Sequence, residues 1–256
     1  ERSRFVSPNH ILALLSIYLK RRRNIPGGLA RSVATTHLID AIARKLDVPL
    51  YETPVGFKYI GELILENKIA LGGEESAGMS MYRHVPEKDG ILACLLVAEM
   101  VANEGKPLTT LIEEMHAEFG YFYTKRVDLK LTPQLRESLA SKLEDPPKRL
   151  NGFEVREVNT TDGVKLIFND QTWLLFRVSG TEGAAYLQLG VNLNYPEGEP
   201  DILEIYPKGG DGWVPRRRCI CGRRLPQPRH LRIPGRRRSH RRRSRVRLHR
   251  GQSAPA

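Results

Sequence analysis

Residues 50–71, LYETPVGFKYIGELILENKIAL, contain the signals for a strand, a helix and a second strand in close succession. Leu50–Glu52 and Ile69–Leu71 have the length of short strands, and Ile60, Leu63 and Ile64 lie on one face of a helix between them. The TPVG segment that separates the first strand from the helix supplies a turn. A strand, a helix and a strand in this order predict an α/β layer with a parallel sheet.

The same alternation extends in both directions from this stretch. Ser7-Pro8 predicts a helix start, residues 32–35 a short strand, and residues 38–46 a second helix. After Leu71, Asp89 is expected to cap a helix over 90–103, and another helix spans 108–119 and ends at Gly120. We therefore predict a three-layer α/β domain with a mainly parallel sheet over residues 1–120.

After residue 120 the pattern changes to alternation of apolar and charged residues, as in Val127, Leu129 and Leu131. A short helix is expected from Thr132-Pro133, followed by strands over 153–158, 164–168 and 173–177, with turns at Asp162-Gly163 and Asn169-Asp170. This composition predicts a smaller α+β domain over residues 121–205.

The net charge of +12 comes from the end of the chain, because residues 211–256 contain 16 Arg and a single acidic residue. The rest of the chain is mildly acidic and gives no reason to expect a nucleic-acid partner. The Arg-rich segment has no apolar period, so we expect a disordered tail over 206–256. Its use of Arg to the exclusion of Lys favours a frameshifted origin, and a genuine Arg-rich binding tail is the alternative.

Other classes of protein are disfavoured by composition. No apolar run reaches the roughly 20 residues that cross a bilayer. Three cysteines are too few for a disulfide framework, so we expect a reducing, cytoplasmic setting. The chain opens on Glu1 without the pattern of a secretory signal, and we expect it to be a fragment.

Three loops carry the residues for chemistry. The loop 72–78, GGEESAG, follows a buried strand and could bind sugar hydroxyls through Glu74 and Ser76, or be a solvated turn. The loop 177–182, RVSGTE, offers a guanidinium and two hydroxyls to a phosphate, or is a polar hairpin end. In the loop 84–90, Lys88 precedes a helix start that would lower its pKa and suit proton transfer; a solvated lysine is the alternative.

Together these segments resemble one family. TPVGFKYIGE (53–62), GEESAG (73–78), EKDG (87–90) and RVSGTE (177–182) are similar in order and spacing to the signatures of the third and fourth domains of the α-D-phosphohexomutases, the phosphoglucomutase and phosphomannomutase family. The resemblance covers about residues 5–185.

The resemblance implies an isomerase, an intramolecular phosphotransferase that interconverts hexose 1-phosphate and hexose 6-phosphate through a phosphoserine and a 1,6-bisphosphate intermediate, with magnesium. Glu-Glu-Ser in the sugar loop resembles the glucose-preferring members. By the same resemblance Lys88 is the catalytic group. The implied substrate-binding residues are Gly56, Lys58, Glu74, Ser76, His84, Arg177, Ser179, Gly180 and Thr181.

The departures from the family pattern limit this expectation. The family's phosphoserine loop and its metal-binding loop have no counterpart in the sequence, so we expect no metal ligands here and no activity of the chain by itself. Val178 and Gly183 stand where the family usually has Pro. Two alternatives stay open: a nucleic-acid-binding protein that acts non-specifically through the Arg-rich tail, and a non-catalytic sugar-phosphate binder.

Overall fold

The computed structural model describes residues 5–130, 132–150, 153–169, 172–178, 186–195, 202–208 and 212–218. The helices are α1 (Pro8–Arg21), α2 (Leu38–Lys45), α3 (Phe57–Leu65), α4 (Gly90–Glu104), α5 (Leu108–Phe119) and α6 (Pro133–Glu144). The strands are β1 (Gly28–Ser32), β2 (Leu50–Thr53), β3 (Ile69–Gly73), β4 (Met79–Met81), β5 (Tyr121–Lys130), β6 (Arg149–Leu150), β7 (Phe153–Asn159), β8 (Val164–Phe168), β9 (Trp173–Val178), β10 (Tyr186–Tyr195), β11 (Ile202–Lys208) and β12 (Gly212–Arg218). By its internal contacts the chain forms two compact units, Glu1–Pro200 and Asp201–Ala256.

Helices α1 and α4 begin at side chains that cap them. Ser7 Oγ accepts the N–H of His10 at 3.3 Å, and Pro8 occupies the first helical position. Asp89 Oδ1 accepts two N–H groups of the first turn of α4, each at 2.9 Å. Both caps confirm the predicted helix starts. Within the described ranges, no helix combines the length and the apolar character needed to span a bilayer.

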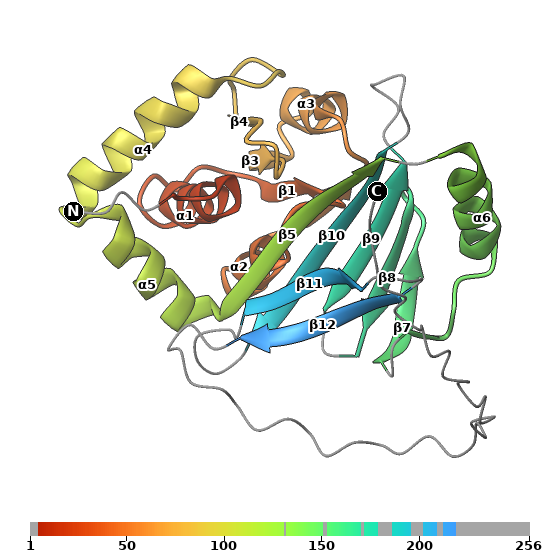
Figure 1. Ribbon diagram of the computed structural model, residues 1–256. Coiled ribbons are helices and arrows are strands. Elements are labelled where there is room, and N and C mark those ends of the chain that lie inside the picture. The colour runs from red at the N-terminus through yellow and green to blue at the C-terminus, as the bar shows by residue number, and fades with distance from the viewer. Residues whose placement is uncertain are drawn as a thin grey trace, which may run out of the picture. The chain divides into compact units, whose positions relative to one another are not determined.

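The first sheet, sheet A, has the strand order β2-β1-β3-β4. Strands β2 and β3 pair with β1 in parallel, whereas β4 is antiparallel to β3. Successive residues of β1 point to opposite faces: Leu29 packs in the core with α1, α2, α4 and α5, and Ala30 packs with α3. Figure 1 shows these helices around the strands of sheet A. Helices thus cover both faces, and the predicted three-layer domain with a mainly parallel sheet is confirmed.

The position predicted for the first strand was wrong. Strand β1 spans residues 28–32 rather than 32–35, and all five of its residues are buried. Beyond Ser32 the chain turns, because the Thr35 N–H donates to the Ser32 carbonyl at 3.0 Å and the two hydroxyls lie 2.9 Å apart. The Ser and Thr side chains that suggested a strand instead hold this turn.

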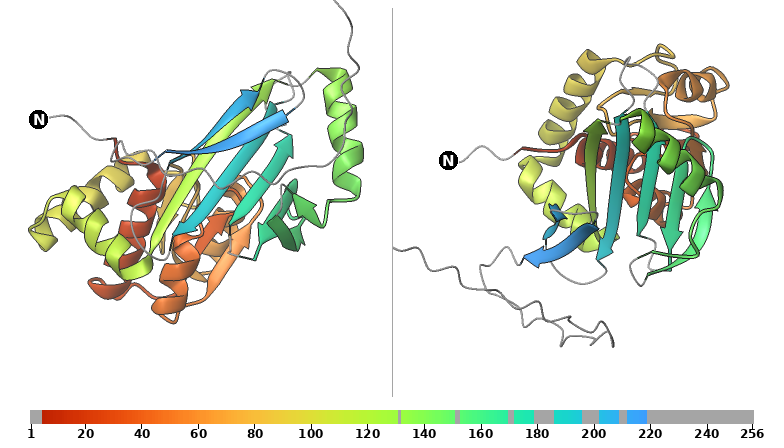
Figure 2. Two further views of the ribbon diagram at one scale, coloured as in Figure 1. Left: turned by 60° about the horizontal axis from the view of Figure 1, so that its bottom comes forward. Right: turned by 45° about the vertical axis from the view of Figure 1, so that its right-hand side comes forward.

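The second sheet, sheet B, has the order β5-β10-β9-β8-β7-β6, and every neighbouring pair is antiparallel (Figure 2). Helix α6 connects β5 to β6 along the chain. The predicted smaller α+β part is therefore confirmed. Strand β10, which was not predicted, lies between β5 and β9. It connects the two strands within the sheet, and its pairing with β5 extends over ten residues.

The second unit contains one described hairpin, in which β11 and β12 pair from Ile202–Arg218 to Lys208–Gly212. Strand β12 and the end of β11 fall within the range 206–256 that was expected to form a disordered tail, and the extent of that tail stays a prediction. Residues 219–256, where the rest of that tail was expected, lie outside the described residues. The boundaries predicted at residues 120 and 205 stay predictions.

A buried group of charged side chains joins sheet A to sheet B within the first unit. Glu52 of β2 accepts hydrogen bonds from Arg31 of β1 and, at 3.0 Å, from Lys165 of β8. Asn159 of β7 donates to the other Glu52 oxygen, and Arg31 also donates to both oxygens of Asp40 in α2. The Arg31 and Lys165 side chains are only 3% and 1% exposed. The positive charges of Arg31 and Lys165 are therefore stabilised in this buried environment by the carboxylates of Glu52 and Asp40.

The pKa values in this group reflect burial and mutual attraction. Burial lowers the pKa of Lys165 to about 8, helped by the charge of Arg31 and opposed by that of Glu52. Burial would raise the pKa of Glu52, but Arg31 and Lys165 hold it below its usual range. Burial also takes the pKa of His37 well below 6.5, so its neutral Nε2 accepts from Lys165 Nζ at 2.9 Å. Lys165 lies over the Trp173 ring, 4.7 Å from its centroid.

Replacing Lys165 with Met should remove a pH-dependent contribution to stability. Folded Lys165 loses its proton near pH 8, whereas the unfolded chain keeps it up to about pH 10.5, so the unfolded state binds more protons in this window. Relative to Lys165→Met, the wild type should therefore gain about 2 kcal/mol of unfolding free energy between about pH 8 and about pH 10. Urea unfolding across this range measures the difference.

The exposed Lys148 provides the matched control, since Lys148→Met should leave the pH profile of the wild type unchanged. A wild-type advantage over Lys165→Met that stays constant with pH would show that Lys165 remains charged when buried.

Candidate substrate-binding site

The carboxyl ends of three parallel strands form one edge of sheet A. Ser32, Thr53 and Gly73 are the last residues of β1, β2 and β3, and the register places these ends next to one another. The loops 54–56 and 74–78 therefore leave the sheet at the same edge. Ligands bind at this edge in α/β sheets.

Glu74 lies at the centre of this edge and is held by backbone groups. Its residue is only 7% exposed, and its Oε1 accepts the N–H of Gly56 at 2.8 Å. The loop closes on itself, since Glu74 N–H donates to the Gly78 carbonyl at 2.8 Å and Ala77 N–H donates to the Glu74 carbonyl at 3.1 Å. A carboxylate fixed in this way can accept hydrogen bonds from vicinal hydroxyls of a ligand. Ser76, at the tip of the same loop, is exposed.

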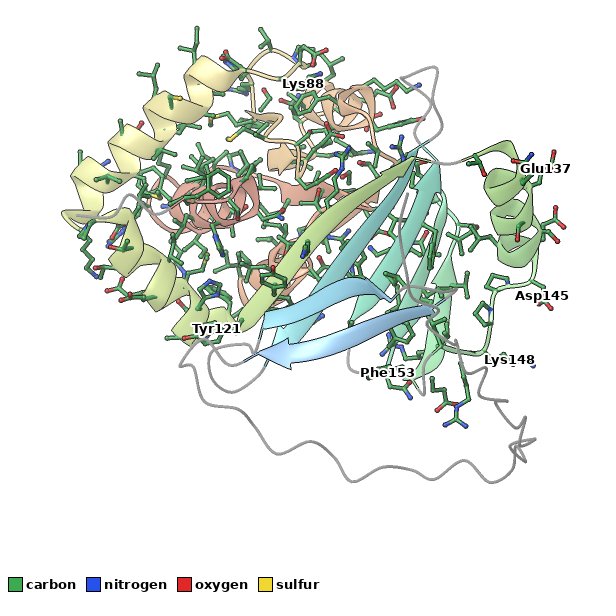
Figure 3. The ribbon with its side chains drawn as sticks, viewed as in Figure 1. Lys88, Tyr121, Glu137, Asp145, Lys148 and Phe153 are labelled. Atoms are coloured by element: carbon green, nitrogen blue, oxygen red, sulfur yellow. The ribbon has the colours of Figure 1, made fainter. Side chains whose placement is uncertain are left out.

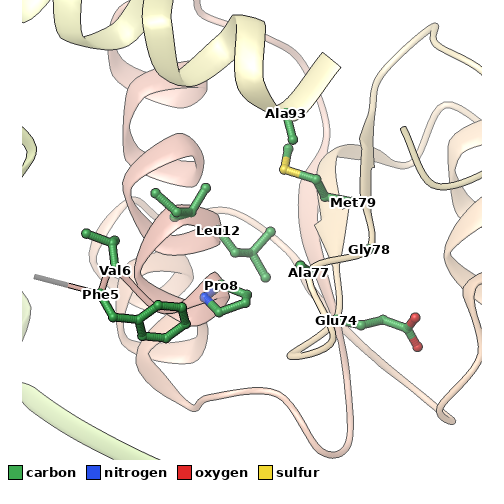
Figure 4. Close-up of a pocket in the computed structure, with 10 residues that line it drawn as sticks. Phe5, Val6, Pro8, Leu12, Glu74, Ala77, Gly78, Met79 and Ala93 are labelled. Carbon is green, nitrogen blue, oxygen red and sulfur yellow. The ribbon is translucent and has the colours of Figure 1, made fainter. Parts of the chain in front are cut away.

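An apolar pocket of about 240 Å³ lies on the other side of this loop, between it and α1. Phe5, Pro8, Leu12 and Met79 line it, and the Glu74 carboxylate points away from these side chains (Figure 4). This apolar lining offers few partners to hydroxyls or phosphate, so we place the candidate site on the carboxylate side of the loop.

Glu75, which was not among the predicted site residues, connects the loop to both sheets. Its Oε2 accepts from Ser32 Oγ at 3.3 Å, and its Oε1 lies 3.8 Å from an Arg126 guanidinium nitrogen in β5. Burial raises the pKa of Glu75, and the neighbouring Glu74 raises it further. The loop is thus fixed from two directions, and a ligand at its tip would meet a preformed surface.

Lys88 and His84 lie in the segment that leads into α4. Lys88 Nζ donates to Glu87 at 2.7 Å and stands 5.4 Å from the centroid of the Phe57 ring at the start of α3 (Figure 3). The Lys88 side chain passes directly against Gly78, so the structure brings it to the end of the Glu74 loop. His84 Nε2 pairs with Asp89 Oδ2 at 2.8 Å, which directs it toward the cap of α4.

Two further predicted residues belong to the start of α3. Gly56 precedes the helix with φ +131°, a conformation that L-residues rarely adopt, and this lets its N–H reach Glu74. Lys58 is exposed, and its ammonium group lies 4.8 Å from the centroid of the neighbouring Tyr59 ring. Gly56 is therefore part of the assembled edge, whereas the contact of Lys58 is with its own helix.

Arg177, near the end of β9, is brought to the same edge by Asp162. Arg177 Nε donates to Asp162 Oδ2 at 2.9 Å, and the same oxygen accepts the N–H of Val55 at 3.0 Å. Asp162 was expected only to form a turn, and neither it nor Val55 was predicted as part of the site; an Asp-Gly pair carries no signal for such a bridge. Ser179, Gly180 and Thr181 lie outside the described residues.

Magnesium, which the family resemblance implies, does not fit the described part of the chain. No three His, Cys, Asp or Glu side chains gather there in a way that could hold a metal ion.

Comparison with known proteins identifies the part of the chain that contains this edge. The family model for phosphoglucomutase/phosphomannomutase, alpha/beta/alpha domain III, matches residues 7–119. Residues 7–119 are a domain III of this family. The predicted resemblance is thereby confirmed, and the Gly56, Glu74 and Lys88 loops all lie within the matched residues. Arg177 lies beyond them.

Relatives extend the similarity to about three quarters of the chain. A phosphoglucomutase/phosphomannomutase from Thermococcus kodakarensis is 30% identical, in a match that covers 75% of this chain and 43% of the relative. A phosphoglucomutase from Rhizobium radiobacter is 30% identical, in a match that covers 75% of this chain and 40% of the relative. The chain thus spans about two fifths of the length of these curated relatives.

Solved structures agree with the family. A putative phosphomannomutase from Thermus thermophilus has a TM-score of 0.58 and 32% identity, over 74% of this chain and 37% of that one. The phosphoglucomutase pp63/parafusin from Paramecium, in its open form, has a TM-score of 0.60 and 26% identity, over 75% of this chain and 38% of that one.

Gly56→Ala should destabilise the phosphohexomutase domain III, because alanine at φ +131° is strained. We expect a loss of about 1–3 kcal/mol of unfolding free energy in urea titrations. Gly90→Ala is the matched control: an added Cβ there meets no atom within 4 Å, and alanine favours the helix that begins at this residue. Equal stability of the Gly56→Ala variant and the wild type would show that the 53–56 loop is not held in this conformation.

Proposed function

We propose that this chain is the substrate-binding part of a phosphohexomutase, an isomerase that interconverts hexose 1-phosphate and hexose 6-phosphate, with glucose as the preferred hexose. The proposal rests on one observation: the Glu74 carboxylate and the Arg177 guanidinium, which are the two candidate ligand-binding groups, are held at the same short backbone segment. Glu74, in the loop that follows β3, accepts the N–H of Gly56. Asp162, which is paired with Arg177 of β9, accepts the adjacent N–H of Val55. A hydroxyl acceptor and a phosphate donor beside each other suit a sugar phosphate.

Each predicted residue has a role in this proposal. Glu74 and Ser76 bind sugar hydroxyls, and Arg177 grips the phosphate that is not transferred, together with Ser179, Gly180 and Thr181. Lys88, beside the Glu74 loop, acts as a proton-transfer or electrostatic group near the reacting oxygen. Gly56, Lys58 and His84 complete the set of substrate-binding residues in this proposal.

The chemistry explains why both anchors have to be fixed. A phosphohexomutase substrate must present first one end and then the other to the phosphoserine. Between the two steps the 1,6-bisphosphate intermediate reorients within the active site. A fixed hydroxyl acceptor and a fixed phosphate anchor accept either orientation. The preference for glucose rests on the Glu74-Glu75-Ser76 sequence of the loop.

The phosphoserine loop and the metal loop of the family have no counterpart among the 256 residues. The groups that take and return the phosphoryl are therefore missing from the chain as given, and we expect it to bind a sugar phosphate without turnover. Non-specific nucleic-acid binding is the alternative activity. It rests on the 16 Arg of residues 211–256 alone.

Glucose 1-phosphate should bind in the millimolar range, on the order of 4 kcal/mol, because an edge open to water screens its charge-assisted bonds. Arg177→Ala should abolish this binding in ³¹P NMR or calorimetric titrations. The control is Arg156→Ala, since Arg156 is an exposed arginine of the same sheet whose side chain is 56% exposed. Unchanged affinity in Arg177→Ala would contradict the assignment of Arg177 to the phosphate.

A coupled assay for glucose 6-phosphate, with magnesium and glucose 1,6-bisphosphate present, should detect no turnover by the chain alone. Turnover that exceeds the blank and disappears in Lys88→Ala would mean that the chain supplies its own phosphoryl carrier.

A further inference from the structure

We infer that Asp162 is a positioning residue, which orients Arg177 and couples the phosphate anchor to the hydroxyl-binding loop. The inference deepens the proposed function and rests on it. Nothing in the family motifs points to Asp162, which lies in the turn between β7 and β8.

The turn is locked against β9 beside Arg177. Gly163 has φ +85°, and a Cβ at this position would come within 2.4 Å of the Phe176 carbonyl, so the backbone of the turn approaches β9 closely. Thr161 N–H donates to Asn159 Oδ1 at 2.8 Å, which fixes the start of the turn. Asp162 therefore has little freedom, and the position of its carboxylate is set by the backbone around it.

Asp162 fixes one edge of the Arg177 guanidinium. The Nε–Oδ2 distance is 2.9 Å, and the side chains of Asp162 and Arg177 are 25% and 17% exposed. Limited exposure reduces the screening of this ion pair by water. A guanidinium carries five N–H donors, so a bond at Nε is compatible with phosphate binding by the same group. The Asp162–Arg177 ion pair therefore fixes the plane of the guanidinium before a ligand binds.

The same Asp162 oxygen reaches sheet A. Oδ2 accepts the Val55 N–H at 3.0 Å, and the next N–H, that of Gly56, donates to Glu74 Oε1 at 2.8 Å. The N–H groups of the Val55-Gly56 dipeptide are thus bound by two different carboxylates, those of Asp162 and Glu74. A displacement of Arg177 is transmitted through Asp162 and this dipeptide to Glu74.

Two effects of removing the Asp162 charge oppose each other. The carboxylate repels a bound phosphate, so its loss would favour binding by simple electrostatics. It also immobilises a long side chain whose ordering must otherwise be completed on binding. We expect the second effect to prevail, because the bond is direct and the turn behind it is rigid.

Asp162→Asn, which keeps the size of the side chain, should weaken glucose 1-phosphate binding about fivefold to tenfold in NMR titrations of the full chain. Glu157→Gln, which removes a 55% exposed carboxylate of β7, should leave the affinity unchanged. In an Arg177→Lys background, which lacks Nε, Asp162→Asn should cause no further loss. A purely structural effect would weaken binding in both backgrounds. Thermal unfolding of each variant checks that it remains folded.

The coupling has a direct readout with inorganic phosphate as the probe. In the wild type, phosphate should shift the amide signals of Arg177, Val55 and Gly56. In Asp162→Asn it should shift only that of Arg177. Equal or tighter binding of glucose 1-phosphate by Asp162→Asn, or an unchanged response of Val55 and Gly56, would overturn this inference and leave the proposed function standing. Absence of glucose 1-phosphate binding by the wild type would overturn both.

Discussion

One partly buried carboxylate, that of Glu52, is shared by two buried cations that come from different sheets. Arg31 reaches it from β1 and Lys165 from β8, and both cations are almost fully removed from water. A buried ion left without its partner typically costs several kcal/mol, so this contact strongly favours a single arrangement of the two sheets in the first unit. Arg31 directly precedes the last residue of β1. The edge that carries the candidate site therefore lies one residue away from the group that joins the sheets.

This arrangement explains why the candidate site is made of backbone groups and carboxylates rather than of loose side chains. Glu74, Glu75 and Asp162 each accept hydrogen bonds that hold a loop or an arginine in place. Three carboxylates near an anion would be unfavourable if they were all free and charged. Asp162 is paired with Arg177, so part of the negative charge at this edge is compensated. Burial raises the pKa of Glu75 above its usual range.

The elements with strong local signals could be predicted from the sequence. Ser7 and Asp89 cap their helices as expected, and the 50–71 stretch contains β2, α3 and β3 in the predicted order. The first strand was misplaced because small residues and hydroxyls continue beyond Ser32, and their side chains bond within a turn that only the folded chain reveals. Strand β10 was not predicted, although Leu187, Leu189, Val191 and Leu193 recur at every second position, as in a half-buried strand.

The chemistry of the site was predictable only where a motif carried it. Gly56, Glu74 and Lys88 were found through their motifs, and the structure brings these three together. Their roles remain predictions, as do those of Ser179, Gly180 and Thr181. Lys165 and Asp162 could not have been found, since a charged residue in an alternating strand reads as solvent-facing and an Asp before Gly reads as a turn. The residues near sheet A that they contact, Val55 and Glu52, lie more than a hundred residues earlier in the chain, and no local sequence pattern predicts such a contact.

The pairing of β3 with β4 limits how the Glu74–Gly78 loop can vary among related proteins. Gly73 pairs with Met79 and Leu71 with Met81, so the Glu74–Gly78 loop is clamped at both ends by strand pairing. Inserting or deleting one residue would move β4 by one position and turn Met79 and Met81 out of the main core. Evolution can therefore exchange the side chains of this loop to suit a different hexose, but its length is set by the register of the strands that flank it.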